Sequence, residues 1–240
     1  MEKVILITGA SSGIGEGIAQ ELGTGGAKLL LGARRRDRID RVAKHINDSG
    51  GTAEAMMLDV TDRAAMAAFA EKAVDLWGRI DVLINNAGVM PLSPLAAGKH
   101  DEWERMVDVN IKGVLWGIGA VLPQMEREES GQIINIASIG ALHVVPTAVV
   151  YCATKFAVRA ISDGLRQESA KIRVTCVNPG VVESDLAATI THEETKAVID
   201  DYRAIALQPA DIARAVRHVI EAPDDVDTTE ITVRPTASPA

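Results

Sequence analysis

Two residues that can exchange a proton with a substrate, Tyr151 and Lys155, stand four positions apart in the chain. The surrounding segment has helical periodicity, so we expect both side chains on one side of a helix. A tyrosine can act as a general acid or base, but its ordinary pKa of about 10 is poorly matched to neutral pH. A lysine ammonium one turn away stabilises the phenolate and lowers that pKa. Such a pair is also common on helix surfaces, so its catalytic interpretation needs further support.

Two more polar residues provide that support. Ser138 lies just beyond a strand expected at residues 132–137, at the carboxyl end where doubly wound sheets bind ligands. Asn110 lies in an apolar helical stretch, where a buried amide must find hydrogen-bond partners. Tyr151 is one of two tyrosines in the chain. Together these residues predict a catalytic group.

A glycine-rich turn near the start of the chain has the spacing of a phosphate-binding loop. Residues 8–15, TGASSGIG, follow a short apolar run and open a helical stretch at 14–22. We expect Gly9 to allow a tight exit from the strand, Gly13 to leave room for a phosphate, and Gly15 to allow close packing of helix and strand. Glycines also cluster in plain loops, but the strand–turn–helix context favours a bound dinucleotide whose pyrophosphate lies at the helix N-terminus.

The residues after the second apolar run indicate which nicotinamide cofactor is bound. NAD-binding folds carry an acidic residue at this place, which holds the ribose hydroxyls and repels a 2′-phosphate. This chain has Ala33 there, followed by Arg34, Arg35 and Arg36. Because arginine contacts phosphate through paired hydrogen bonds, we expect Arg34, with Arg35, to bind the 2′-phosphate of NADP. The alternative is that the triplet merely begins a solvated surface helix.

Asp59 closes the third apolar run and has two interpretations. Its carboxylate could accept a hydrogen bond from the amino group of adenine, or it could cap the amino end of the next helix. Thr61 and Asp62 could provide the same cap. Both interpretations of Asp59 stay open at this point.

Apolar runs and helical stretches alternate along almost the whole chain. Strands are expected at residues 3–8, 28–33, 52–58, 80–84, 132–137, 172–177 and 230–233, and helices at 14–22, 37–48, 62–77, 101–128, 149–169 and 209–221. Short apolar strands separated by helices predict a parallel sheet that is covered on both faces. The chain, residues 1–240, is therefore expected to form a single α/β domain of the Rossmann type, with a mainly parallel seven-stranded sheet and helices on both faces.

The composition excludes several classes of protein. The chain has 240 residues, of which 47% are hydrophobic and 24% charged, so a disordered or collagen-like chain is excluded. A net charge of -8 argues against nucleic-acid binding, which needs a basic face. The apolar stretch at 113–122 is shorter than the roughly 18 residues of a membrane span, and no signal-peptide pattern is present. Cys152 and Cys176 match neither a disulfide framework nor a zinc site. We expect a soluble, cytoplasmic protein without a metal or a membrane partner.

In their order and spacing, these motifs resemble the short-chain dehydrogenase/reductase family. The matching pieces are the turn at residues 8–15, NNAG at 85–88, Asn110, Ser138, YCATK at 151–155 and NPG at 178–180. The resemblance covers residue 3 to about residue 185. Within the family the chain is similar to the single-domain, NADP-dependent branch of 3-hydroxy-acid dehydrogenases and carbonyl reductases.

The resemblance implies a role for each catalytic residue. Tyr151 would donate the proton in reduction and accept it in oxidation, while Lys155 would lower its pKa and hold the nicotinamide ribose. Ser138 would hydrogen-bond the substrate oxygen, and Asn110 would hold a water that links Lys155 to solvent. The cofactor-binding residues that follow from the motifs and the resemblance are Gly9, Ser11, Ser12, Gly13, Ile14, Gly15, Arg34, Arg35, Asp59, Val60, Asn86, Ala87, Gly88, Tyr151, Lys155, Pro179, Gly180, Val182 and Ser184.

The segments on either side of the tyrosine are expected to form the substrate pocket. Residues 140–146 are mostly apolar and run between Ser138 and Tyr151. The region at 181–203 has no clear strand and weak helical periodicity, and we expect it to be a lid. The candidate substrate contacts are Gly140, His143, Val144 and Glu183. An exposed loop position is the alternative for both the histidine and the glutamate.

The predicted reaction is the interconversion of a primary or secondary alcohol and an aldehyde or ketone by hydride transfer, with NADP(H) favoured over NAD(H). One alternative is a ketoacyl carrier-protein reductase, but residues 229–236, TEITVRPT, depart from the glycine-rich ending of that group. Another is a dinucleotide-sensing protein without turnover, which could have lost Tyr151 or Lys155. The expected partner is a small carbonyl or alcohol, and the resemblance implies a homotetramer or homodimer.

Overall fold

Seven short apolar segments form the strands of one sheet. In the computed structural model, which describes residues 2–238, they are β1 (Val4–Thr8), β2 (Lys28–Ala33), β3 (Thr52–Met57), β4 (Val82–Asn85), β5 (Gly131–Ile136), β6 (Ile172–Pro179) and β7 (Glu230–Val233). The strand order is β3-β2-β1-β4-β5-β6-β7, and every neighbouring pair is parallel. The predicted fold class is confirmed, with a wholly rather than mainly parallel sheet. The expected domain, residues 1–240, includes residues 1 and 239–240, which lie outside the described part.

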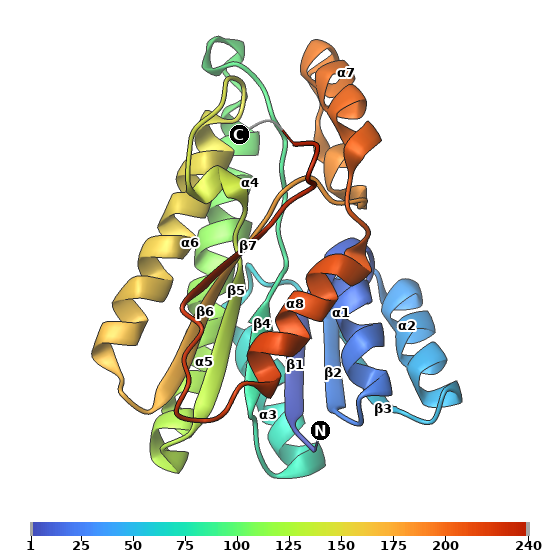
Figure 1. Ribbon diagram of the computed structural model, residues 1–240, viewed down its shortest axis with the longest axis vertical. Coiled ribbons are helices and arrows are strands. Elements are labelled where there is room, and N and C mark those ends of the chain that lie inside the picture. Colours follow the sequence, from blue (N-terminus) through green and yellow to red (C-terminus); the bar gives the residue numbers. More distant parts are fainter. Residues whose placement is uncertain (1, 239–240) are drawn as a thin grey trace.

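Helices cover both faces of the sheet (Figure 1). On one face the core is built with α1 (Gly13–Thr24), α2 (Arg36–Asp48) and α8 (Pro209–Glu221). On the other face it is built with α3 (Arg63–Trp77), α5 (Gly113–Glu128) and α6 (Val149–Glu168). All five residues of β1 are buried, because this central strand is covered from both sides. This explains why its sequence is a continuous apolar run and not an alternating one.

The helical stretch expected at residues 101–128 is interrupted. It consists of α4 (His100–Val107), a π-helical turn η2 (Asp108–Lys112) and α5. A π-helical turn holds one extra residue and is frequent at functional sites. The predicted helical stretch is present, but the sequence analysis did not predict the wider turn at residues 108–112, which carries Asn110.

The same stretch, His100–Glu128, is long and apolar enough to cross a membrane by length and composition alone. In the structure 44% of its apolar window is buried, and α5 packs against β4 and β5. The core helix of a globular protein passes the same test, so the observation is weak evidence for a membrane span.

The segment between β6 and α8 contains a helix that the sequence analysis did not predict. Helix α7 (Glu193–Tyr202) follows the short 3-10 turn η4 (Asp185–Thr189) and lies beyond the carboxyl ends of the strands (Figure 1). Of its ten residues only Thr195 is buried, so it lacks the apolar stripe that reveals an amphipathic helix.

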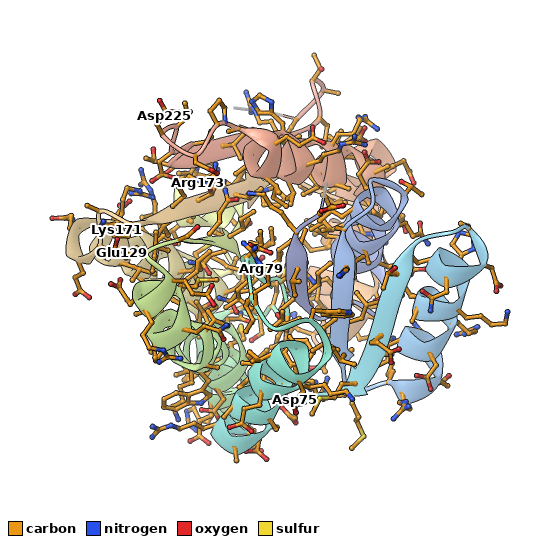
Figure 2. All side chains as sticks on the ribbon, turned by 90° about the horizontal axis from the view of Figure 1, so that it is seen from below. Asp75, Arg79, Glu129, Lys171, Arg173 and Asp225 are labelled. Carbon is orange, nitrogen blue, oxygen red and sulfur yellow. The ribbon has the colours of Figure 1, made fainter. Side chains whose placement is uncertain are left out.

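The opposite end of the sheet is closed by loops with charged residues (Figure 2). Arg79 pairs with Asp81 there, and Lys171 lies 3.1 Å from the carboxylate of Glu129. These charged side chains are paired with one another at the end of the sheet away from the predicted site residues.

Candidate active site

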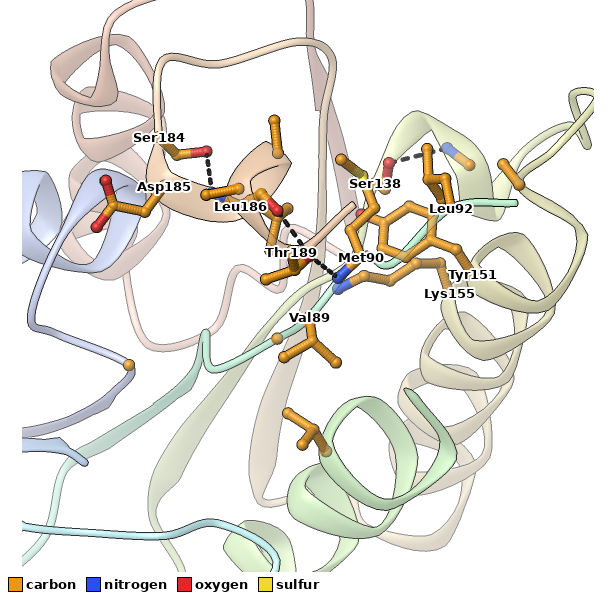
Figure 3. A pocket seen from close by; sticks show the side chains of 18 of the residues that line it. Val89, Met90, Leu92, Ser138, Tyr151, Lys155, Ser184, Asp185, Leu186 and Thr189 are labelled. Carbon is orange, nitrogen blue, oxygen red and sulfur yellow. Dashed lines mark hydrogen bonds between the residues drawn. The ribbon is translucent and has the colours of Figure 1, made fainter. Parts of the chain in front are cut away.

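A cavity of about 1640 Å³ lies at the carboxyl ends of the strands (Figure 3). Pockets for single small ligands have roughly 300–1,000 Å³, so this one has room for a dinucleotide and a second small molecule. Its walls include the glycine-rich turn, the arginines after β2, the loop after β4, the end of β5 and the start of α6. The topology therefore brings together segments that are up to about 140 residues apart, as expected at a switch point of a doubly wound sheet.

Ser138 and Tyr151 meet at one side of this cavity. The serine caps the 3-10 turn η3 (Ile139–Ala141), where its Oγ accepts a hydrogen bond of 3.0 Å from the amide of Gly140. Burial raises the pKa of Tyr151 to about 12, while its hydrogen bond with Ser138 acts in the opposite direction. The phenol is therefore protonated at neutral pH and shares a hydrogen-bond network with the serine.

Lys155 lies one turn further along α6, as its spacing from the tyrosine predicts. Its Nζ donates a hydrogen bond of 2.9 Å to the carbonyl of Ile136 and lies 5.7 Å from the ring centroid of Tyr151. Burial lowers the pKa of the lysine to about 8. The sequence analysis expected the lysine to lower the pKa of the phenol. In the structure burial is the main cause of the shift, which is upward, and the hydrogen bond with Ser138, not the lysine, lowers the pKa of the phenol.

Asn110 lies behind the cavity wall and is buried. Its Oδ1 accepts a hydrogen bond of 2.9 Å from the amide of Val89, and its Nδ2 donates to the carbonyl of Val89 at 3.0 Å. The same Nδ2 donates to Oγ1 of Thr154 at 3.1 Å. The side-chain amide of Asn110 thus connects the loop after β4 with Thr154, the residue before Lys155. The π-helical turn places Asn110 within reach of both partners.

The glycine-rich turn approaches the loop after β4 very closely. Gly9 has a φ of +68°, and a Cβ atom there would lie 2.8 Å from Cα of Ala87. Gly15 does not line the cavity; a Cβ there would collide with the side chain of Asn86 and the carbonyl of Gly9. Nδ2 of Asn86 donates to the carbonyls of Thr8 and Gly9 at 2.9 and 3.1 Å. Gly15 therefore serves packing, as predicted, while its neighbours in the turn face the cavity.

The arginine triplet divides in two. Arg34 and Arg35 line the cavity, whereas Arg36 pairs with Asp40 one turn along α2, at 2.8 Å. Arg35 donates to Oγ of Ser12 at 2.7 Å and to Oγ of Ser11 at 3.1 Å. The two arginines at the end of β2 therefore face the same cavity as the glycine-rich turn. Only Arg36 fits the alternative of a solvated residue at the start of a surface helix.

Asp59 lines the cavity together with Val60. Its Oδ1 accepts hydrogen bonds from the amide and hydroxyl of Thr61 at 3.0 and 2.8 Å. The amino end of α3 is capped by Asp62, whose carboxylate accepts from the amides of Ala64 and Ala65. The helix-cap interpretation of Asp59 is therefore wrong.

Comparison with known proteins agrees with this arrangement. Residues 3–195 match the family model of the short chain dehydrogenases. The chain belongs to the short-chain dehydrogenase/reductase family. It is 47% identical to an uncharacterized oxidoreductase of Staphylococcus saprophyticus, a match that covers 98% of this chain and 97% of that protein.

Two solved structures of dehydrogenases are similar over nearly the whole chain. An alcohol dehydrogenase from the archaeon Thermococcus sibiricus, complexed with 5-hydroxy-NADP, has a TM-score of 0.90 and 30% identity, covering 100% of this chain and 99% of the other. The closed form of a serine dehydrogenase complexed with NADP+ has a TM-score of 0.91 and 30% identity, covering 99% of this chain and 96% of the other.

The remaining cofactor candidates of this family member lie along the same cavity. Its walls include Ser11, Ser12, Gly13, Ile14, Ala87, Gly88, Pro179, Gly180, Val182 and Ser184. The last of these is held by a local bond, because its Oγ accepts from the amide of Leu186 at 3.3 Å. A Cβ atom on Gly13, whose φ is +55°, would lie 2.8 Å from Cβ of Ser184. The segment after β6 therefore rests directly on the glycine-rich turn.

Two of the four predicted substrate contacts lie elsewhere. Gly140 and His143 line the cavity, but Val144 does not and is exposed. Glu183 does not line it either; its carboxylate pairs at 2.6 Å with Arg203, which does line the cavity. Charge pairing within residues 181–203 explains the glutamate better than a substrate contact does.

Three residues at the cavity were not singled out from the sequence. Arg38 and Asp185 form an ion pair of 2.7 Å between α2 and η4. Thr189 accepts a hydrogen bond of 3.1 Å from the amide of Met90 and so joins the segment after β6 to the loop after β4 (Figure 3). The basic run from residue 34 to 38 was a signal for the arginine. A single aspartate and a single threonine in an irregular segment gave no such signal.

Proposed function

We propose that the chain interconverts a primary or secondary alcohol and an aldehyde or ketone with NADP(H). The observation that carries this proposal is the meeting of Ser138, Tyr151 and Lys155 in the cavity that also contains the glycine-rich turn and Arg34. Two hydroxyl donors side by side suit a carbonyl oxygen on which negative charge develops. The proposed site residues keep the roles implied by the resemblance, with Val144 and Glu183 removed.

The cavity fits a nicotinamide dinucleotide carrying a 2′-phosphate. The positive φ angles of Gly9 and Gly13 and their lack of side chains leave a cradle at the start of α1, where amides can face a pyrophosphate. Ser12, the residue before the helix, makes no side-chain cap of its own. Arg34 and Arg35 supply cations at the end of β2, and both solved structures named above hold NADP compounds. When bound, NADPH supplies the hydride.

The protein's own part is to hold the substrate oxygen and to move one proton. Ser138 and Tyr151 donate hydrogen bonds to that oxygen, and the tyrosine O–H passes its proton to the alkoxide in reduction. A pKa of about 12 keeps the phenol protonated at neutral pH, so its proton is present when reduction begins. In oxidation the phenolate accepts the proton, and the ammonium of Lys155 stabilises it. Asn110 would position this lysine through its hydrogen bond to Thr154. We also propose that Asn110 holds the water that links Lys155 to solvent.

The region at 181–203 is proposed to act as a substrate lid. Its base is pinned, because the amide of Leu207 donates to Val181 at 3.0 Å and the amide of Glu183 donates to Leu207 at 2.9 Å. Helix α7 above this base contributes Thr195 and Tyr202 to the cavity wall. The hydroxyl of Tyr202 bonds Oγ of Ser238 at 2.8 Å, so the far end of α7 is held by the last described part of the chain.

Assembly and location complete the proposal. We propose a soluble, cytoplasmic homotetramer or homodimer; Leu115 on α5 and Phe156 on α6 are exposed apolar side chains that a second copy could cover. Light scattering after size-exclusion chromatography would report the mass of the particle. A monomer at micromolar concentration would contradict the proposed assembly but not the proposed reaction.

The test of the function is the rate of NADPH consumption with a panel of aldehydes, ketones, 3-oxo acids and a ketoacyl thioester, with NADH as the comparison. Turnover of simple carbonyls with NADPH is the expected result. Turnover restricted to the thioester would favour the carrier-protein reductase, and tight NADPH binding without any turnover would favour the sensor.

A further inference from the structure

The carboxylate of Asp185 lies between two arginines of another part of the chain. Its Oδ2 atom is 2.9 Å from Nη1 of Arg35 and 2.7 Å from Nη1 of Arg38. Asp185 begins the turn η4 after β6, whereas both arginines come from the β2–α2 region, about 150 residues earlier. These two ion pairs therefore join the proposed lid to the arginines that line the cofactor cavity.

These arginines are placed for an anionic ligand. Arg35 is held against the glycine-rich turn by Ser11 and Ser12, and Arg38 lies one turn further on and lines the same cavity. A 2′-phosphate on the ribose of NADP needs such donors, and it presents oxygens of the same kind as a carboxylate. Asp185 thus occupies donors that the phosphate would use.

The lid backbone keeps the aspartate in this position. Ser184 lies against Gly13, and its Oγ accepts from the amide of Leu186, which shapes the turn around Asp185. In Figure 3 the carboxylate of Asp185 points away from Tyr151 and Lys155. The residue is therefore placed to act on the adenosine end of the cofactor and not on the reacting atoms.

We propose that Asp185 determines cofactor specificity by competing with the 2′-phosphate of NADP for Arg35 and Arg38. The preference for NADP over NAD is then set by two segments: the arginines favour the phosphate, and the lid carboxylate opposes it. Binding of NADP requires the arginines to exchange one anion for the other, while NAD leaves the ion pairs in place. The proposal rests on NADP(H) as the cofactor and is independent of the substrate.

The expected size of the effect is moderate. The side chains of Arg35, Arg38 and Asp185 are 42%, 40% and 53% exposed, and ion pairs at such positions are weak and sensitive to salt. Removal of the carboxylate is therefore expected to strengthen binding of a 2′-phosphate about three- to tenfold at low ionic strength. The gain should shrink as salt is added.

The experiment measures the dissociation constants of adenosine 2′-monophosphate and adenosine 5′-monophosphate by calorimetry for the whole chain and for Asp185→Asn. These probes lack the nicotinamide, so the result does not depend on turnover. Tighter binding of the 2′-phosphate by the variant, with the 5′-phosphate unchanged, is expected, and NADPH should gain over NADH in the same proportion. Asp40→Asn is the matched control, because it removes an exposed, arginine-paired carboxylate on α2 that does not line the cavity.

Two results would overturn the proposal, and they can be told apart. Unchanged or weaker binding of the 2′-phosphate by Asp185→Asn and by Asp185→Ala, or an equal gain in Asp40→Asn, would show that Asp185 does not compete. Equal binding of the two phosphates by the unaltered chain would overturn the assignment of NADP(H) as well.

Discussion

The ammonium of Lys155 lies 5.7 Å from the ring centroid of Tyr151, and both side chains are buried. Burial moves their pKa values apart, raising that of the phenol to about 12 and lowering that of the lysine to about 8, because burial opposes the charged form of each group. A charged cofactor or a developing alkoxide beside this pair would therefore change the pKa values of both groups at once. The pair differs in this respect from an exposed tyrosine and lysine at the same helical spacing.

Tyr151→Phe removes the O–H that transfers the proton and leaves the ring in place. We expect kcat to fall about a hundred- to ten-thousand-fold, the usual contribution of a positioned general acid. The dissociation constant of NADPH, followed by its fluorescence, should change little. Turnover at the unaltered rate would exclude the tyrosine as the proton donor.

Arg34→Asp places a carboxylate directly after Ala33, the position at which NAD-binding folds carry an acidic residue. Because a hydrogen bond to a charged group contributes about 1.5–3 kcal/mol, NADPH should bind about ten- to a hundredfold more weakly, and NADH should gain relative to it. The measurement is kcat/KM for both cofactors with one substrate.

The matched control is Arg36→Asp, which makes the same change of charge two residues away on a side chain that pairs with Asp40 outside the cavity. It should leave the ratio of the two cofactors near its original value. An unchanged ratio in Arg34→Asp would mean that other residues bind the 2′-phosphate.

Lys155→Met should make the protein more stable at neutral pH while it removes activity. The pKa of the lysine falls from 10.5 to about 8 in the folded protein, so the unfolded chain binds more protons between these values. The free energy of unfolding therefore rises with pH across this window, and at pH 7 the buried charge costs about 3 kcal/mol. The lost hydrogen bond to Ile136 offsets about 1 kcal/mol of the gain.

Urea denaturation at pH 7.0 and pH 9.5 checks this prediction. The methionine variant should exceed the original protein by about 2 kcal/mol at the lower pH, and the gap should narrow at the higher pH. Lys44→Met, at a position with a 73% exposed side chain, should show no such narrowing. A variant that is less stable than the original at pH 7.0 would contradict a burial cost at Lys155.

Gly13→Ala combines a backbone strain with a collision, and Gly50→Ala separates the two. Both glycines have a positive φ, of +55° and +85°, but a Cβ on Gly50 would meet nothing within 4 Å. Each alanine should lower the free energy of unfolding by about 1–2 kcal/mol through the left-handed backbone. Only Gly13→Ala should also weaken NADPH binding, since it pushes Ser184 and the lid base away from the turn. Equal NADPH affinity in the two variants would show that this contact is unimportant for the cofactor.

The sheet and the order of its elements along the chain could be predicted because most of the strands, among them β1, β4 and β6, are continuous buried runs. The apolar run of β1 and the glycines that follow it indicate both the strand and the turn. The position of Arg34 and Arg35 at the cavity could be predicted for the same reason, because the information lies within a few neighbouring residues.

Features that depend on distant contacts were not visible. The π-helical turn at Asp108–Lys112 lies within an uninterrupted helical pattern, and the bonds of Asn110 to the loop after β4 show its purpose only in three dimensions. Helix α7 buries Thr195 alone and so has no periodicity to detect. The role of Asp185 depends on arginines about 150 residues away, which no local pattern can indicate.

The bond between Tyr202 and Ser238 has a practical consequence for handling the protein. It places Ser238 beside Tyr202 in the wall of the cavity, whereas β1 begins at the far end of the sheet (Figure 1). A surface attachment near Ser238 would stand next to the proposed lid and is expected to slow the exchange of cofactor. Attachment through Lys3, just before β1, would instead turn the entrance toward the solution.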